Sequence, residues 1–488
     1  MRKILLYTLM TLAAAGMASC EDFLTRDTYD QIGSDEFWKS ETDLELYANG
    51  FIQKMIPGDG TITRGDIYAD YCAVDIPTDL LRPDGNVSPD NQTGWAESNW
   101  TNLRRVNYML DNMHKCRGRV SDEIYNHYEG VARFWRAWFY YDKVQTFGAV
   151  PWYDKEIDSG DHAALYKPRD SREYVMSKVL EDLDFACRNC ITNAKLEVNS
   201  VRITRNVALA FKARCCLYEG TFRKYHATDP STGEPWTSDE AEKYLRACVE
   251  ACETLMGEGK YSLVSDPANV ATQYRGLFTS EDVATQEVIW ARAYDASLSA
   301  THILNTYFVN MQYGSYSLTR QFVNTYLNRD GSRFTDRADY KSTTYAEQFE
   351  NRDYRLQQTV ISPEYRKLVG GTSKLFAPDL SVSYTGYQVI KFNIDDDSYE
   401  ASGICWNCLP ILRYAEVLLN YAEAKAELGE FDDAVWDKTI KPLRERAGVD
   451  GTRPTKIDEY LQNAYYSTDD GNPKICLLYT SDAADEAR

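Results

Sequence analysis

Two short cysteine pairs have the spacing from which proteins build metal sites. Cys187 and Cys190 are separated by two residues, as are Cys405 and Cys408. A structural zinc site needs four ligands that converge in space, and the chain has only 5 His to complete such a set. The alternative is that the cysteines are small buried hydrophobic residues, with an occasional disulfide outside the cytoplasm. We expect this second role, and therefore predict no metal ion and no cofactor.

Catalytic motifs that can be recognised by sequence are missing. The chain has no Gly-x-Ser-x-Gly, no His-Glu-x-x-His, no Walker loop and no Gly-x-Gly-x-x-Gly. Acidic residues abound, including the run Asp395–Asp397, so composition alone leaves a glycosidase acid/base pair open. Three consecutive Asp in a loop are more often solvated surface, or occasionally a calcium contact. We therefore expect no enzymatic activity.

Charge and aromatic content restrict the classes of partner. The chain carries 74 acidic and 54 basic residues, a formal net charge of −20. This argues against nucleic acid, whose phosphates need a basic surface. The 36 Tyr and 10 Trp are many. Aromatic rings can stack on the C–H faces of sugars, but they also fill helical cores and protein interfaces, and packing is the expected role for most of them.

The first twenty residues have the features of a lipoprotein signal. A basic start at residues 2–3 precedes the apolar stretch Ile4–Met17, which is too short to span a bilayer. The stretch runs into Ala18-Ser19-Cys20, which resembles a bacterial lipobox and implies cleavage before Cys20 and lipidation of its thiol. The alternative is an ordinary signal peptide with an incidental cysteine. Lipid on Cys20 would anchor the chain, and no later apolar stretch is long enough to cross a membrane.

Helices dominate the predicted fold. Apolar periodicity predicts packed helical hairpins over 121–186, 203–256 and 409–448, with a further helix over 100–113. An amphipathic helix is also predicted within 30–55, where Phe37 and Trp38 read as core anchors and Ser34 as the capping residue. The helical period weakens in residues 257–408, and Val288–Arg292 and Tyr387–Asn393 are predicted as short strands.

The most regular stretch is Leu409–Gly448, which is predicted to form two helices joined by a tight turn. Leu412, Ala415 and Leu418 fall on one face of the first helix. That helix should end at Gly429, since glycine readily takes the left-handed conformation after a helix. Small residues at Ala422, Gly429 and Ala434 have the spacing of a tetratricopeptide-type hairpin, whose helices approach closely and need neighbours to cover their apolar face.

The same stretch carries both halves of a family motif. The first half is RYAEVLLNYAEA at residues 413–424, and the second is LRERAG at residues 443–448. On these residues the chain resembles the SusD/RagB-like glycan-binding lipoproteins of Bacteroidetes, and a generic tetratricopeptide hairpin would not share both halves. The resemblance implies a mainly α fold: a superhelical, tetratricopeptide-like α/α bundle with an irregular, loop-rich second lobe containing a few short strands.

The resemblance also implies a function. A surface-exposed lipoprotein of this family, anchored in the outer membrane through Cys20, would capture oligosaccharide or polysaccharide and deliver it to a SusC-like TonB-dependent transporter. In the family, a loop such as 57–94 lies on the face that meets glycan, so Trp95, Asn91 and Arg82 become candidate ligand residues, with packing under its own loop as the alternative for Trp95. Three tyrosines of the irregular lobe are second candidates, with packing in a loop core as their alternative: Tyr294, Tyr313 and Tyr316.

The expected organisation along the chain is a signal peptide, two regions of the body and a truncated end. The segments are 1–19 (signal), 20–256 (helical region), 257–408 (irregular lobe), 409–475 (C-terminal hairpin) and 476–488. The last segment resembles the translation of a sequencing adapter, and we expect it to be a non-native tail. Two other functions stay open on sequence alone: a protein-binding adaptor of tetratricopeptide type, and a surface glycoside hydrolase. The sequence does not identify the glycan.

Overall fold

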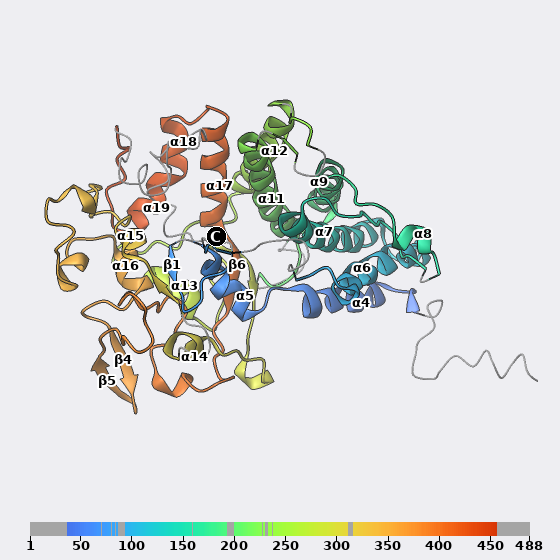
Figure 1. Cartoon of the computed structure of the whole chain (residues 1–488). Coiled ribbons are helices and arrows are strands. Elements are labelled where there is room, and N and C mark those ends of the chain that lie inside the picture. The colour runs from blue at the N-terminus through green and yellow to red at the C-terminus, as the bar shows by residue number, and fades with distance from the viewer. Residues whose placement is uncertain are drawn as a thin grey trace, which may run out of the picture.

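The chain folds into two lobes (Figure 1). One lobe is helical, and the other is made of short helices, short strands and loops; each contains its own large hydrophobic cluster. The predicted mainly α architecture with an irregular second lobe is confirmed. Cys20 and the suspected tail lie outside the described residues. The computed structural model describes residues 37–69, 71–79, 81–82, 84–85, 93–158, 160–192, 200–226, 228–229, 233–236, 238–310 and 316–455.

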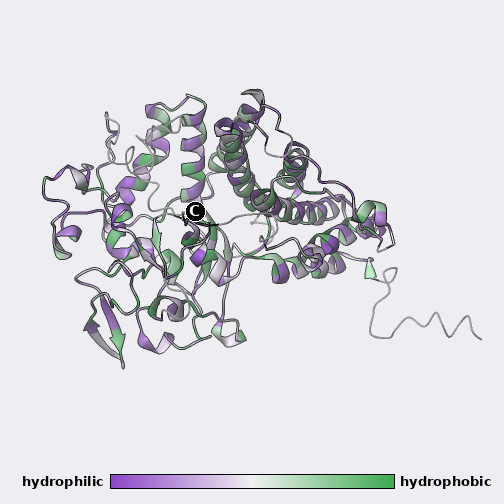
Figure 2. Ribbon diagram, in the orientation of Figure 1, coloured by the Kyte–Doolittle hydropathy of each residue, from purple (hydrophilic) through white to green (hydrophobic). Residues whose placement is uncertain are grey.

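Packed helix pairs build the helical lobe, as predicted over 121–186 and 203–256. Helix α7 packs on α9, α11 packs on α12, and α17 lies against both α11 and α12 (Figure 1). Hydrophobic and hydrophilic residues are interleaved along α11 and α12 in Figure 2, as expected of helices with one buried face. The helices of this lobe are α4 (Glu41–Met55), α6 (Thr101–Asn112), α7 (Asp122–Phe147), α8 (His162–Leu165), α9 (Arg172–Asn189), α11 (Arg205–Tyr225), α12 (Ser238–Gly257) and α17 (Tyr414–Glu427).

Local sequence explains where the long helices begin. The Ser121 hydroxyl accepts a hydrogen bond from the Ile124 N–H at 3.3 Å, and the Thr204 hydroxyl accepts one from the Val207 N–H at 3.4 Å. Each cap satisfies an N–H group that the first turn of a helix leaves without an internal partner. Helix α4 is capped in the same way by Ser40, and the proposed cap Ser34 lies outside the described residues.

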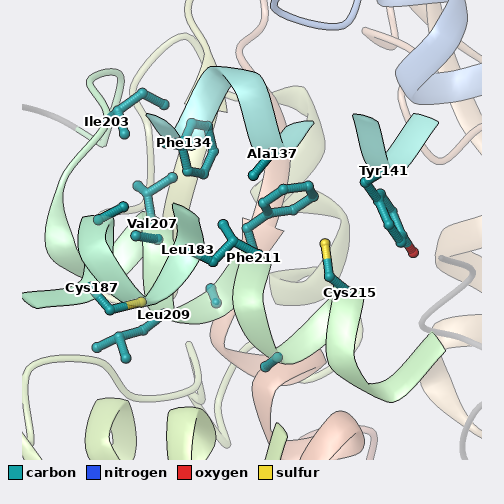
Figure 3. Packing of buried hydrophobic residues seen from close by; sticks show 14 of the residues in the cluster. Phe134, Ala137, Tyr141, Leu183, Cys187, Ile203, Val207, Leu209, Phe211 and Cys215 are labelled. Atoms are coloured by element: carbon teal, nitrogen blue, oxygen red, sulfur yellow. The ribbon is translucent and has the colours of Figure 1, made fainter. Parts of the chain in front are cut away.

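The core of this lobe lies between α7, α9 and α11. Phe134 and Ala137 of α7 and Phe211 of α11 face one another in Figure 3, and the Phe134 and Phe211 rings are 5.3 Å apart. Cys187 and Cys215 lie among these apolar side chains (Figure 3). All ten described cysteines are buried and outside any disulfide, as expected of small core residues.

Helices α11 and α12 approach each other closely at Gly220. A Cβ atom at this position would lie 2.8 Å from Leu245 Cγ and 3.1 Å from the Leu245 backbone nitrogen. Only glycine leaves enough room for this contact, so Gly220 fixes the distance between the two helices.

The structure of Leu409–Gly448 differs from the prediction in two places. Leu412 belongs to strand β6 (Leu409–Arg413), which pairs with the correctly predicted strand β2 (Val288–Arg292), so the first helix begins only at Tyr414. It ends at Gly429 as expected, with φ of 73°. The second helix is divided at Thr439, because Pro442 has no N–H and is tolerated only in the first turn of a new helix. The two parts are α18 (Asp433–Lys438) and α19 (Ile440–Arg446).

The second lobe is held together by short elements and loops. Its described residues form two further two-stranded antiparallel sheets, β1–β3 and β4–β5. The predicted strand over Tyr387–Asn393 is wrong: Gln388 and Val389 make only isolated bridges, because they pair with two different segments, at Ser317 and Val360. Residues 59–74, although close to α4 in sequence, pack in this second cluster. The elements are α5 (Asp59–Arg64), β1 (Cys72–Ala73), α13 (Gln273–Thr279), α14 (Leu304–Val309), β3 (Ser317–Leu318), α15 (Arg320–Val323), α16 (Tyr354–Thr359), β4 (Arg366–Val369) and β5 (Thr372–Leu375).

A fully buried carboxylate joins the two halves of the C-terminal motif. Glu287 Oε1 accepts hydrogen bonds from Arg413 Nη1 at 2.9 Å and from Arg446 Nη1 at 2.8 Å. Its other oxygen accepts from the Val264 N–H at 2.7 Å. Glu287 thus ties strand β6 and helix α19 to the segment that leads into β2. Across the described residues we find no helix with the length and apolar character needed to cross a membrane.

Candidate functional site

A cavity of about 280 Å³ lies where the two lobes meet, and we call it the interlobe cavity. Thr61, Asp66 and Tyr71 line it together with residues of the second lobe, and Trp138 of α7 and Arg214 of α11 line it from the helical lobe. Aromatic and charged side chains share its walls, so it could hold a small polar molecule or ordered water. Its lining includes Thr61, Asp66, Tyr71, Trp138, Arg214, Tyr316, Phe322, Lys391, Arg413 and Glu416.

The charged groups in this cavity are mostly matched. Arg214 donates to both carboxylate oxygens of Glu416 at 2.6 Å and to the Ile411 carbonyl at 2.9 Å. Burial raises the pKa of Asp66, while the charge of Lys391 and a hydrogen bond from Tyr71 oppose that rise. The cavity therefore contains a paired, nearly neutral set of charges, which suits a structural role between the lobes.

The structure places the two described tyrosine candidates differently. Tyr316 lines the interlobe cavity, where its hydroxyl donates to the Thr63 carbonyl at 2.9 Å, and only 3% of the residue is exposed. Tyr294 is 7% exposed and packs edge to face against His302, with 4.5 Å between ring centres. Both rings are thus part of the packed second lobe, and a ligand contact by either stays a prediction.

Trp95 occupies a different part of the molecule, at the surface of the helical lobe. Its indole makes edge-to-face contacts with Trp100 at 5.5 Å and with Phe147 at 4.9 Å. The Arg169 guanidinium carbon lies 4.5 Å from the centre of the same ring. We call these four residues the Trp95 cluster. The indole is half-buried, so part of it remains available to a ligand.

Lys143 of α7 holds the segment that carries Trp95. Its ammonium group donates to the Gly94 carbonyl at 2.8 Å and lies over the Phe139 and Phe147 rings. Burial lowers the pKa of Lys143, and the neighbouring carboxylate of Asp142 partly offsets this effect. The contact fixes the backbone next to Trp95, so the indole is positioned by the long buried helix rather than by its own loop.

The structure says less about the three remaining candidate ligand residues. Arg82 is half-exposed and forms ion pairs with Asp79 at 3.5 Å and Asp84 at 3.3 Å. Asn91 and Tyr313 lie outside the described residues. Their roles as ligand residues stay predictions.

The acidic run 395–397 is engaged in protein contacts. Asp395 accepts hydrogen bonds from Arg275 and Tyr365. Asp396 caps a short helical turn by accepting from the Ser398 N–H at 2.8 Å, and Asp397 accepts from the Gly370 N–H at 3.1 Å. The run therefore stabilises loops through hydrogen bonds. The interpretations of the run as solvated surface or as a calcium contact did not include this role. In the part of the chain that the structure covers, no group of three His, Cys, Asp or Glu side chains could hold a metal ion.

Sequence reasoning missed the two cations of the Trp95 environment. Arg169 follows α8 in a connecting segment, and Lys143 sits within a helix whose pattern indicates burial. Neither position stands out in sequence. The one available signal was Lys143, a lysine near the end of an apolar helix. A buried ammonium group needs a hydrogen-bond acceptor close by, so its position indicates a contact with another segment.

Two family models match the chain. A model described as "SusD family" matches residues 286–475, and one described as "Starch-binding associating with outer membrane" matches residues 52–202. The first match contains Glu287, Arg413 and Arg446, and the second contains Trp95, Lys143 and Arg169.

Individual relatives are distant but extend over most of the chain. The SusD-like protein P38 of Formosa agariphila is 22% identical over 90% of this chain and 81% of its own length. A SusD-like protein from Bacteroides fragilis has a solved structure with a TM-score of 0.66 and 19% identity, covering 92% of this chain and 86% of that one. A SusD-like carbohydrate binding protein from the same species gives a TM-score of 0.65 at 17% identity, over 92% and 85% of the two chains. The fold is therefore that of the SusD-like proteins, and the chain belongs to the SusD/RagB-like family.

Proposed function

We propose that this protein captures oligosaccharides at the bacterial cell surface and delivers them to a SusC-like TonB-dependent transporter. The observation that carries the proposal is the match of the starch-binding, outer-membrane model to residues 52–202. That region contains the Trp95 cluster, in which a half-buried indole packs against Phe147 of helix α7. Lys143 of the same helix donates a hydrogen bond to the adjacent Gly94 carbonyl. Loops that carry ligand residues on a stable scaffold are typical of binding proteins.

The proposed address is the outer surface of the outer membrane. The family model that matches residues 52–202 is described as associating with the outer membrane. The lipobox-like sequence that ends at Cys20 supports an anchor by lipid, and one acyl-bearing cysteine would hold the protein at the bilayer without a spanning helix. Mass spectrometry of the mature protein from a membrane fraction would test this, since lipidation adds acyl chains to an N-terminal Cys20.

Binding is proposed to occur without cleavage of the glycan. The solved relative from Bacteroides fragilis is named a carbohydrate binding protein, and residues 395–397 of this chain are engaged in loop contacts. Stacking on Trp95, with hydrogen bonds from nearby loops, would supply the affinity. That affinity should be modest, since sugar hydroxyls exchange water for protein with little net gain.

The test is a titration of the chain beginning after Cys20 against a panel of polysaccharides, with reducing ends assayed in parallel. We expect binding without release of reducing ends, and at least about tenfold weaker binding in Trp95→Ala but not in Trp95→Phe. Tyr174→Ala is the matched control, because Tyr174 is an aromatic residue of the same lobe with 43% exposure and a lysine near its ring.

Two results would count against the proposal. Failure of the panel to bind at all would remove the capture function, and release of reducing ends would show an enzyme. Delivery is tested separately by co-purification with a SusC-like transporter from the membrane fraction. A chain that binds glycan but no transporter would leave only the capture step.

A further inference from the structure

Arg169 is an exposed arginine held against the face of a tryptophan. Its guanidinium carbon is 4.5 Å from the centre of the Trp95 ring. A guanidinium that stacks on a ring uses its flat face for this contact, so the five N–H donors in its plane stay directed outward. The arrangement presents a fixed fork of donors beside the aromatic cluster.

Among the described residues, no carboxylate forms an ion pair with this fork. In the covered part of the chain no ion pair or hydrogen bond involves the Arg169 side chain, although Asp170 is its neighbour in sequence. Asp170 is already engaged: its Oδ2 accepts from Lys167 Nζ and from the Trp152 N–H, both at 2.7 Å. In contrast, Arg172 is buried and bonded to Glu219.

The charges around Arg169 are largely balanced among themselves. Lys143 lies behind the cluster, with its Nζ 2.8 Å from the Gly94 carbonyl and 4.0 Å from Asp142. Lys167 forms an ion pair with Asp170, and the charge of Lys143 is partly compensated by Asp142. These carboxylates therefore do not compensate the positive charge of Arg169. A local excess of positive charge is notable on a chain whose net charge is −20, because most of its surface would repel an anion.

We propose that Arg169, supported by Trp95, is a subsite for an acidic sugar, in which the guanidinium binds the carboxylate of a uronate or the oxygens of a sulfate ester. The proposal rests on the glycan-binding function proposed above and specifies its substrate class. Planar guanidinium groups bind such anions with two parallel hydrogen bonds. The hydroxyls of a neutral sugar can accept hydrogen bonds from this fork but gain no charge–charge attraction, and a neutral sugar must displace Arg169 before it can stack on the same face of Trp95.

The test compares one sugar chain with and without its charges. The probes are a galacturonate hexamer, its fully methyl-esterified neutral form, a sulfated oligosaccharide of similar length, and inorganic sulfate alone. We expect the wild-type protein to bind the acidic hexamer at least about tenfold more tightly than its ester, with the difference shrinking at high salt. In Arg169→Met this preference should disappear, and Arg169→Lys should retain part of it.

Arg117→Met is the matched control. Arg117 is also exposed, and its guanidinium carbon lies 4.0 Å from the centre of the Tyr125 ring on the same lobe. It should leave the preference unchanged, which separates a local subsite from a change in total charge. Circular dichroism of both variants confirms that each is folded.

The outcomes distinguish this inference from the function on which it rests. If the ester binds as tightly as the acid, or if Arg169→Met and Arg117→Met have equal effects, the acidic subsite is wrong while glycan capture stands. If neither neutral nor acidic glycans bind, both proposals fail. Binding of inorganic sulfate alone, with no acidic glycan bound, also overturns the subsite. Binding of either acidic probe that depends on Arg169 supports it.

Discussion

Replacing Glu287 by glutamine should destabilise the protein strongly. Glu287 is 0% exposed and supplies the shared negative charge for Arg413 and Arg446, which donate to the same oxygen at 2.9 and 2.8 Å. Glutamine keeps the shape of the side chain but removes the negative charge that the two buried guanidinium groups share. It also places an amide that can donate hydrogen bonds beside the Val264 N–H or beside the arginines.

The magnitude follows from what it costs to leave a buried charge unpaired. Removing one partner of a buried ion pair typically costs about 3–5 kcal/mol, and whole domains are stable by only about 5–15 kcal/mol. We therefore expect Glu287→Gln to lower the free energy of unfolding by about 3–5 kcal/mol. Urea unfolding followed by circular dichroism and tryptophan fluorescence measures this change.

A control and a second variant make the prediction specific. Glu281→Gln removes the same charge at an exposed site in the same segment, and should change stability by less than about 0.5 kcal/mol. Adding Arg446→Met to Glu287→Gln removes one of the two guanidinium groups that share Glu287. The free energy of unfolding of the double variant should therefore fall by less than the sum of the decreases in the two single variants. Equal effects of Glu287→Gln and Glu281→Gln, or strict additivity in the double variant, would refute the reasoning.

Two further predictions concern packing and pH. Gly220→Ala should destabilise by about 1–2 kcal/mol in urea unfolding, because its Cβ would meet Leu245 at 2.8 Å and this overpacking outweighs the gain in helix propensity. Gly50→Ala, in α4 with nothing within 4 Å of the new Cβ, should instead stabilise by about 0.5–1 kcal/mol. Burial lowers the pKa of His127 to about 4, and its Nδ1 accepts from the Ile191 N–H. The unfolded state then binds more protons between pH 6.5 and 4, so stability is lost as the pH falls through this window, by up to about 3 kcal/mol, and His127→Gln should lack this component.

Each of these two predictions has a result that would contradict it. A Gly220→Ala variant as stable as the wild type would mean that α11 and α12 are not packed as described. Identical pH profiles of wild type and His127→Gln between pH 4 and 6.5 would show that the imidazole is not held neutral.

The helical lobe and the family could be predicted well from sequence. Packed helices over 121–186 and 203–256, strand β2, the burial of Trp38 and the left-handed Gly429 follow from periodicity and residue type. These features depend on interactions between residues a few positions apart, so the pattern along the chain contains the information. The motif at 413–424 and 443–448 was recognisable for the same reason.

The errors occurred where partners distant in sequence decide the conformation. Leu412 has a helical pattern, but its backbone pairs with Trp290 of β2, a partner that is distant in sequence. Sequence also could not show why the two halves of the motif occur together. The structure supplies the reason, since Arg413 and Arg446 meet on Glu287.

The candidate site illustrates the same division. The sequence made Trp95 a candidate for binding sugar, because the family resemblance places its loop on the face that meets glycan and an indole can stack on a sugar. Only the tertiary structure showed that Tyr294 and Tyr316 are packed in the second lobe. It alone also brought Arg169 onto the Trp95 ring. The physical reason is that residue type and helical period are local properties, whereas burial, charge balance and the pairing of rings with cations depend on which distant segments the folded chain places side by side.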